Sequence, residues 1–132
     1  MSKENLETLR AVVDAWNRGD SEAAFRHAAP DIEFDNTRDL GEWRGLHTTR
    51  EEAMQAWERF ADPWESVHIE IDELVDAGDQ VVCRVTGTLR GRDGIEVEAR
   101  NNWLWRFRDR QVTHLVSYRE FDDALEGAGL SR

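Results

Sequence analysis

Hydrophobic and polar side chains alternate most regularly along residues 95–108, which read IEVEARNNWLWRFR. Apolar residues take most odd positions and charged residues most even ones, a period of two that is typical of a β-strand with one buried face. At about 3.3 Å per residue such a strand crosses a small domain. We therefore expect it to be the central strand, with its odd face toward the interior. Asn101 is the polar member of that face, and a buried amide needs a partner, either in a core network or on a ligand.

Before this strand, apolar residues recur at helical spacing in three stretches. The first stretch is residues 4–18, and a short second helix follows it and stops before Pro30. Thr48 and Glu51 match the capping box of a third helix, which ends before Pro63. The first half of the chain is therefore predicted to be mainly helical.

Alternation also predicts four further strands, at residues 31–36, 67–72, 80–91 and 112–121. Gly87 indicates a bulge in the third of these, and neither face of the last one is purely apolar. The stretch TRDLGEWRGLH has no period and predicts a loop that carries Asp39 and Trp43. Asp122 or Asp123 can cap a short C-terminal helix.

Helices followed by antiparallel strands indicate an α+β domain with its helices on one face of the sheet. We expect one domain over residues 1–132, because this length suits one core and no linker or repeat interrupts it. Three N-terminal helices packed on a strongly curved, mostly antiparallel sheet would form a cone-shaped α+β barrel. The space between helices and sheet would be a conical cavity.

The composition limits the partners. The formal net charge is −11, from 28 acidic and 17 basic residues, so the field of the protein repels phosphate backbones and anionic lipids. We expect neither nucleic acid nor a membrane as a partner. The charged N-terminal residues and the absence of a long apolar run favour a soluble cytoplasmic protein.

Neither a cofactor nor a metal is indicated by the sequence. The histidines lie on separate elements without metal-ligand spacing, and there is no phosphate-binding or dinucleotide motif. Cys83, the only cysteine, lies in an apolar strand and is predicted to be an inert buried thiol. The six tryptophans and five phenylalanines either fill a core or line an apolar cavity.

Four segments appear in a suggestive order: WNRGD, DIEFDN, GEWRG and WRFRDRQVTHLVSYREFDD. This order resembles the SnoaL-like branch of the nuclear transport factor 2-like superfamily, and the likeness covers nearly the whole chain. The superfamily includes polyketide cyclases, ketosteroid isomerases, limonene epoxide hydrolases, dehydratases and members with no known activity. The fold alone does not choose among these activities.

The resemblance implies that the cone is the ligand site and that the odd face of residues 95–107 is its back wall. It also implies that Leu115, Ser117 and Arg119 face the cavity. The alternate residues of that strand would point outward: Val112, His114, Val116 and Tyr118. In family members the outer sheet face commonly forms a homodimer, so we expect one here.

The catalytic groups of these relatives are not matched. Ketosteroid isomerases use an aspartate base, a tyrosine and a protonated aspartic acid, and the register puts Asn36, Val12 and Trp103 at those positions. The epoxide hydrolases need aspartates around an arginine, and the cyclases need an acid–base aspartate near a histidine. No carboxylate occupies the inward positions of the central strand. Asp35 could replace the base only if the end of its strand bulges.

Two candidate catalytic residues remain, Asp35 as the base and Arg119 as a cation that holds a carboxylate or polarises a carbonyl oxygen. As alternatives, Asp35 could cap the end of its strand and Arg119 could form an internal ion pair with Asp35, Asp39 or Glu120. The expected walls of the ligand pocket are Asn36, Trp57, Asn101, Trp103, Trp105, Leu115 and Ser117.

These residues suggest a cofactor-independent acid–base enzyme of the isomerase, cyclase or lyase type. Its ligand would be a small hydrophobic molecule that contains a carbonyl group or is polycyclic. One alternative is a noncatalytic ligand-binding protein with the same cavity. Another is a dimerisation domain whose cone is filled by its own rings.

Overall fold

The computed structural model describes residues 2–130, which form four helices and six strands. In chain order these are α1 (Ser2–Asn17), α2 (Ser21–Phe25), β1 (Ala28–Asp35), β2 (Leu46–His47), α3 (Arg50–Ala61), β3 (Ser66–Asp76), β4 (Gln80–Arg90), β5 (Glu96–Arg108), β6 (Gln111–Tyr118) and α4 (Phe121–Gly127). The sequence predicted this order except for the two-residue β2, which lies in the stretch expected to be irregular.

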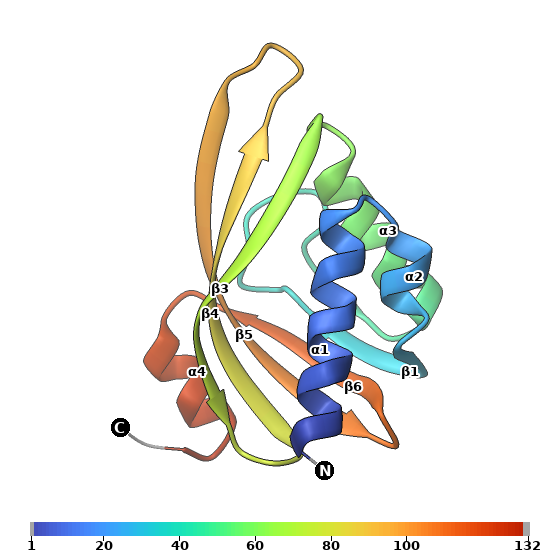
Figure 1. Ribbon diagram of the computed structural model, residues 1–132, viewed down its shortest axis with the longest axis vertical. Coiled ribbons are helices and arrows are strands. Elements are labelled where there is room, and N and C mark those ends of the chain that lie inside the picture. The colour runs from blue at the N-terminus through green and yellow to red at the C-terminus, as the bar shows by residue number, and fades with distance from the viewer. Residues whose placement is uncertain (1, 131–132) are drawn as a thin grey trace.

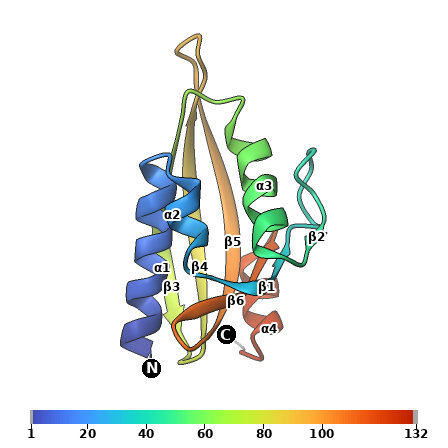
Figure 2. The same cartoon turned by 90° about the vertical axis from the view of Figure 1, so that its right-hand side faces the viewer.

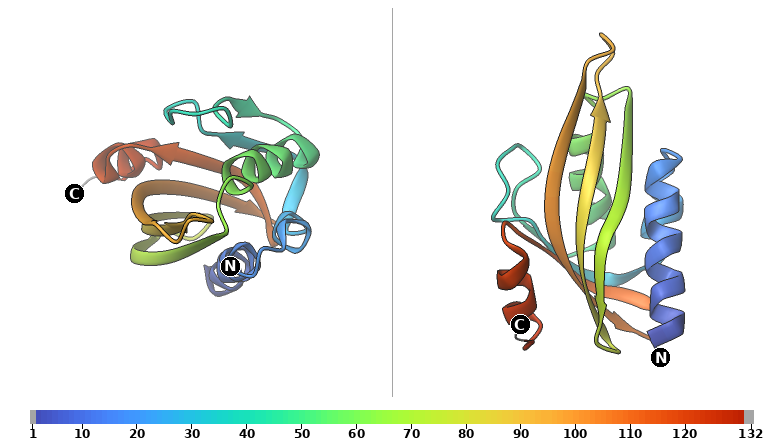
Figure 3. Two further views of the ribbon diagram at one scale, coloured as in Figure 1. Left: turned by 90° about the horizontal axis from the view of Figure 1, so that it is seen from above. Right: turned by 60° about the vertical axis from the view of Figure 1, so that its left-hand side comes forward.

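The six strands form one strongly curved sheet in the order β2-β1-β6-β5-β4-β3 (Figures 1 and 3). The β1–β6 pair is parallel and the other neighbours are antiparallel. As predicted, β5 lies in the interior of the sheet, where Trp103 pairs with Cys83 on β4 and with Ser117 on β6. The predicted α+β class and the strongly curved, mostly antiparallel sheet are confirmed, although the sheet does not close on itself.

Helices cover both faces of this sheet. The three N-terminal helices pack on one side, and α4 packs on the other (Figures 1 and 2). Trp103, Trp105 and Phe107 point from β5 into the main core beneath α1, α2 and α3. Leu104 points the other way, into a second apolar cluster with Phe121 and its neighbours on α4. The alternation along β5 therefore separates two cores.

Helix caps lie close to the predicted ones but differ in detail. The N-cap of α3 is Thr49, whose hydroxyl accepts a hydrogen bond of 3.1 Å from the Glu52 N–H. Glu52 Oε1 in turn accepts one of 3.2 Å from the Thr48 N–H. The capping box therefore lies one residue later than the predicted Thr48 and Glu51 pair. Glu120 is the N-cap of α4, so Asp122 and Asp123 lie within the first turn instead of capping it.

The predicted bulge at Gly87 is wrong, because Gly87 pairs in register with Ile69 on β3 and Ala99 on β5. The register of β5 and β6 instead shifts after Arg106, so that Arg106 pairs with His114 and Phe107 with Val112. This shift turns Val112 into the main core, where it is buried. The expectation that Val112 points outward is therefore also wrong.

The odd face of β5 is not buried along its whole length. Ile95 is 63% exposed and Val97 is 43% exposed. The β4–β5 hairpin extends beyond the helices, at the top of Figure 1, so no helix covers this end. The expectation that the odd face lines the interior holds from Asn101 onward and fails nearer the turn.

None of the helices within residues 2–130 combines the length and the hydropathy that a bilayer span requires.

Candidate functional site

A cavity with two adjoining parts lies between α3, the loop after β1 and the inner face of β5. The inner recess has a volume of about 60 Å³ and the outer cavity about 490 Å³. Both parts are lined by Asp39, Trp43, Trp57, Phe60, Asn101 and Trp103. The recess is further lined by Trp16, Phe34, Asn36, Ala56, Leu115 and Ser117.

Aromatic rings form the walls of the recess. Trp16 and Trp57 are stacked, with ring centroids 4.3 Å apart and an angle of 15° between the planes. Trp103 meets Trp16 edge to face at 5.6 Å, and Trp43 meets Phe60 in the same way at 5.0 Å. These contacts hold the rings in fixed positions, so the walls suit a flat, apolar molecule.

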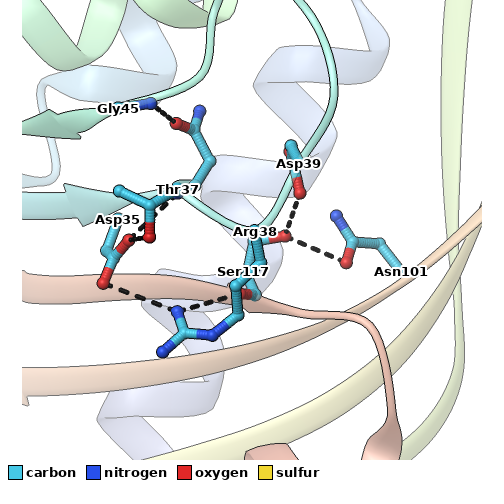
Figure 4. A network of polar contacts seen from close by, with 8 residues as sticks. Asp35, Thr37, Arg38, Asp39, Gly45, Asn101 and Ser117 are labelled. Carbon is cyan, nitrogen blue, oxygen red and sulfur yellow. Dashed lines mark hydrogen bonds and ion pairs between the residues drawn. The ribbon is translucent and has the colours of Figure 1, made fainter.

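Asp39 places a carboxylate on the wall of both parts. Its Oδ1 accepts a hydrogen bond of 2.8 Å from the Ser117 hydroxyl, and its Oδ2 accepts one of 3.1 Å from the Trp43 indole N–H. The same hydroxyl lies 3.0 Å from Asn101 Oδ1, so Ser117 stands between the two residues (Figure 4). Neither partner of Asp39 is a cation, and no ion pair to Asp39 is formed within residues 2–130. Two hydrogen bonds from neutral donors therefore fix the Asp39 carboxylate in position, and no cation lies within ion-pair distance of it among the described residues.

Two side-chain amides face the recess with unused donors. Asn36 is only 2% exposed, and its Oδ1 accepts a hydrogen bond of 2.8 Å from the Gly45 N–H. Asn101 Oδ1 accepts from the Asn102 N–H at 2.8 Å and faces the Ser117 hydroxyl. These contacts orient both amides, and neither Nδ2 has a hydrogen-bond acceptor among the described residues. The recess therefore offers two amide donors to a ligand.

The outer cavity is also lined by three arginines, Arg38, Arg100 and Arg119. Arg38 lies 3.6 Å from the Asp35 carboxylate and over the ring of Tyr118. Arg119 donates its Nε–H to the Arg38 carbonyl oxygen at 3.1 Å.

A family model described as the SnoaL-like domain matches residues 9–115. The chain belongs to the SnoaL-like family. The match covers most of the chain and includes the loop that carries Asp39, and the predicted resemblance is confirmed.

Solved structures support the fold of this SnoaL-like domain. A nuclear transport factor 2-like protein of unknown function from Burkholderia pseudomallei is 17% identical, covers 93% of this chain and 95% of its own, and has a TM-score of 0.75. TerC, co-crystallised with polyporic acid, is 17% identical, with coverage of 93% and 98% and a TM-score of 0.76.

A third structure, of a protein with a ketosteroid isomerase-like fold from Catenulispora acidiphila in complex with trimethylamine, is 22% identical, with coverage of 94% and 93% and a TM-score of 0.73. These identities show a shared fold alone. The search of curated proteins found no match.

The recess of this SnoaL-like domain brings together most of the residues that the sequence suggested for the pocket. Its walls include Asn36, Trp57, Asn101, Trp103, Leu115 and Ser117. Trp105 is the exception, because it is fully buried behind Trp16 and its Nε1–H points to Cys83 Sγ at 3.3 Å. Trp105 lines neither part of the cavity and belongs to the core. That expectation is corrected.

Asp35 lies outside the cavity. Phe34 and Asn36 point inward, and strand alternation places Asp35, between them, on the other face, beside Val116 of β6. Its Oδ1 accepts hydrogen bonds from the N–H and hydroxyl of Thr37 at 3.1 and 2.7 Å, and in Figure 4 it points toward Arg38 and away from Asn101. No bulge brings it into the cavity, so the prediction of Asp35 as the base in the cavity is corrected. The alternative, that Asp35 caps the end of its strand, describes these contacts.

Asp39 is the carboxylate that sequence reasoning did not place in the site. It lies four residues before Trp43 on a loop without periodicity, and its position depends on Ser117, which is far away in the sequence. The available signal was the GEWRG segment, because an indole N–H in a loop needs an acceptor, and Asp39 and Glu42 are the carboxylates just before Trp43.

Metal ligation has no candidate here, because residues 2–130 contain no group of three or more His, Cys, Asp or Glu side chains placed to hold an ion. Cys83 is fully buried, and burial raises the pKa of its thiol to about 12. A thiol of this kind is protonated at neutral pH and does not act as a nucleophile.

Proposed function

We propose that this SnoaL-like protein binds a small, flat, carbonyl-containing molecule and catalyses proton transfer at the carbon next to the carbonyl. One observation carries the proposal: the recess holds the Asp39 carboxylate together with the free amide donors of Asn36 and Asn101. Every group that this reaction needs is a side chain of the protein, so the chemistry requires no cofactor.

The reaction uses the carboxylate as a base and the amides as donors. Asp39 takes a proton from the carbon α to the carbonyl, and the electron pair of the broken C–H bond moves onto the carbonyl oxygen. The resulting enolate oxygen accepts hydrogen bonds from Asn36 Nδ2 and Asn101 Nδ2, which are oriented before the ligand arrives. The protonated Asp39 then returns the proton to the same carbon or to a neighbouring one.

The recess and the outer cavity differ in volume and would hold different parts of the ligand, a small head group and a larger body. The recess, at about 60 Å³, is far smaller than the outer cavity and accepts only a small head group. A carbonyl and its α-carbon are of that size. The outer cavity of about 490 Å³ has room for a ring system, which would lie against Trp57, Phe60 and Trp103.

Two proteins with the same fold have been crystallised with small molecules. TerC was crystallised with polyporic acid and the Catenulispora protein with trimethylamine. Neither name identifies the ligand of this chain. Both proteins were crystallised with a small molecule, which is the class of ligand proposed here.

The test is hydrogen exchange in 2-acetonaphthone, a flat ketone with an acidic methyl group. In D₂O, loss of the acetyl methyl signal in the NMR spectrum reports proton abstraction. The wild type should accelerate this loss, and Asp39→Asn should reduce the acceleration by about 100-fold or more, the usual size of a general-base contribution. Asn101→Leu removes one amide donor at similar volume and should reduce it by about 10-fold or more.

Asp35→Asn is the matched control, because it removes a carboxylate four residues from Asp39 that lies outside the cavity. Its exchange rate should equal that of the wild type. Equal rates in Asp39→Asn and the wild type would remove Asp39 from the mechanism and contradict the proposed reaction.

A second candidate is ligand binding without turnover. It is favoured by the two hydrogen bonds that Asp39 already accepts, from Ser117 and from Trp43, since they occupy an acceptor site on each of its carboxylate oxygens. Quenching of tryptophan fluorescence by 2-acetonaphthone, without faster exchange, would support this candidate over the enzyme.

The expected homodimer through the outer sheet face remains a proposal. Part of that face is covered by α4, which buries Val82 and Leu104. A dimer would have to use parts of the face that α4 does not cover, such as the area on β3 and β4 where Glu70, Asp72 and Thr86 lie.

A further inference from the structure

Arg119 is an exposed residue that lines the outer cavity, and two of its atoms are held by hydrogen bonds. It follows β6 in the alternation that turns Leu115 and Ser117 inward, and it lines the outer cavity. Its carbonyl oxygen accepts a hydrogen bond of 3.0 Å from Asn102 Nδ2, which ties down the backbone. Its Nε–H donates to the Arg38 carbonyl oxygen at 3.1 Å, which ties down the base of the guanidinium.

The two Nη atoms of this guanidinium make no hydrogen bond to any residue that the structure describes. No described carboxylate forms an ion pair with Arg119, and neither Nη atom has a hydrogen-bond partner within residues 2–130. The ion pair that sequence reasoning allowed, with Asp35, Asp39 or Glu120, is not formed. Its neighbour Arg38 differs, because Asp35 lies 3.6 Å from its guanidinium. An arginine fork with two free Nη atoms fits a carboxylate through two parallel hydrogen bonds.

The charged residues of the cavity favour one orientation of the bound ligand. The Asp39 carboxylate lies on the wall of the recess, so an anionic group in the recess would be repelled. Arg119 lines the outer cavity and not the recess. Arg100 adds positive charge nearby, although alternation along β5 places its side chain on the face opposite Asn101. The favoured ligand therefore places a neutral head group next to Asp39 and an anionic group next to Arg119.

We propose that the ligand is an anion, a flat ketone whose ring system carries a carboxylate, and that Arg119 binds this carboxylate in the outer cavity. This inference rests on the proposed function and adds the substrate class to it. The overall charge of −11 would disfavour an anionic ligand. Selectivity for an anion therefore has to come from a local contact, and Arg119 provides one.

The test compares two probes of nearly equal shape, 6-acetyl-2-naphthoate and the neutral 6-acetyl-2-naphthamide, by isothermal titration calorimetry. The wild type should bind the naphthoate at least tenfold more tightly than the naphthamide. Arg119→Gln should abolish this preference by weakening the naphthoate alone. Arg119→Lys keeps the charge without the fork and should retain part of it.

Two further measurements make the result specific. Arg108→Gln removes an exposed arginine at the far end of β5 and should keep the full preference, which shows that net charge alone is not responsible. Raising NaCl from 50 to 500 mM should reduce the preference in the wild type, because the contact is partly exposed to solvent.

The outcomes separate this inference from the proposed function. Equal affinity for the two probes in the wild type, or an unchanged preference in Arg119→Gln, would overturn the anion site while leaving the cavity as a site for neutral ketones. Failure of both probes to bind would overturn the proposed function and the anion site with it.

Discussion

Ser117 on β6 donates a hydrogen bond of 2.8 Å to Asp39 Oδ1, and this contact ties the loop after β1 to the sheet. The hydroxyl has a single proton and also lies 3.0 Å from Asn101 Oδ1, so it can donate to only one of the two at a time. Ser117 is 2% exposed. Its bond to a charged group is therefore expected to contribute measurably to stability.

Ser117→Ala should lower the free energy of unfolding by about 1 to 2 kcal/mol, because a buried hydrogen bond to a carboxylate is lost. Urea denaturation measures this change. In a double-mutant cycle with Asp39→Asn, the coupling between the two positions should be about 0.5 kcal/mol or more. Ser66→Ala, at an exposed serine on β3, is the control and should change stability by no more than about 0.5 kcal/mol. Additive effects of Ser117→Ala and Asp39→Asn would show that the contact is not important in solution.

A second prediction concerns Trp16, whose buried Nε1–H has no hydrogen-bond partner in the described part of the chain. Its ring lines the recess and also a second cavity, and the stacked Trp57 lines both of them as well. Trp16→Phe removes the unpaired donor together with some buried surface. The same change at Trp105 removes an N–H that is paired with Cys83 Sγ.

We therefore expect Trp16→Phe to be less destabilising than Trp105→Phe by about 1 kcal/mol, since the first change also relieves an unsatisfied group. Urea unfolding of the two variants gives the comparison. If the order were reversed, the Trp16 N–H would have an acceptor in solution, such as a water molecule in one of the two cavities.

The main elements could be predicted because each has a local signal. The alternation along residues 95–108 identified the central strand and placed Asn101 and Trp103 on the face that lines the cavity. Alternation shows which residues share a face but not whether another element covers that face. Ile95 and Val97 were therefore expected inside, although no helix reaches them.

The remaining differences come from long-range contacts that leave no periodic signal. Val112 is turned inward by a register shift between β5 and β6, which depends on how two strands meet. Asp39 becomes part of the site through Ser117, 78 residues further along the chain. The sequence did place Asn36 on the inner side of its strand. Moving the base to Asp35 required a bulge at the end of the strand, but the irregularity of β1 lies between Ala28 and Glu33, and residues 33–35 pair with β6 in regular register.

A third prediction concerns Asn17, the last residue of α1, which serves as a partner for the edge strand β3. Its Oδ1 accepts a hydrogen bond of 2.7 Å from the Ile69 N–H, and its Nδ2 donates one of 3.0 Å to the Ile69 carbonyl oxygen. Asn17→Ala should lower the free energy of unfolding by about 2 kcal/mol, because two partly buried hydrogen bonds are lost. Hydrogen exchange of the Ile69 amide should accelerate in the same variant.

Asn17→Asp separates the two contacts, because it keeps the acceptor and removes the donor. Protection of the Ile69 amide should be largely retained in this variant while stability falls. Arg18→Ala, at the exposed neighbouring residue, should leave that amide unchanged. Identical exchange of the Ile69 amide in the wild type and Asn17→Ala would contradict the role of Asn17.

The last prediction concerns Cys83, whose thiol is fully buried and accepts the Trp105 indole N–H. Burial disfavours the thiolate and raises the pKa of the thiol from its ordinary value of 9.0 to about 12, although the contact with Trp105 acts in the opposite direction. The native protein should therefore react with a thiol reagent such as 5,5′-dithiobis(2-nitrobenzoic acid) only at the rate at which it opens, while the unfolded chain reacts at once.

The raised pKa also fixes the sign of the pH dependence. Below pH 9 the thiol is protonated in both states and does not change the stability. Between pH 9 and about 12 the unfolded chain loses this proton and the folded chain keeps it, so the free energy of unfolding should fall as the pH rises. Cys83→Ala should lose this part of the alkaline decrease in a urea denaturation series. The same decrease in both proteins would mean that other groups cause it.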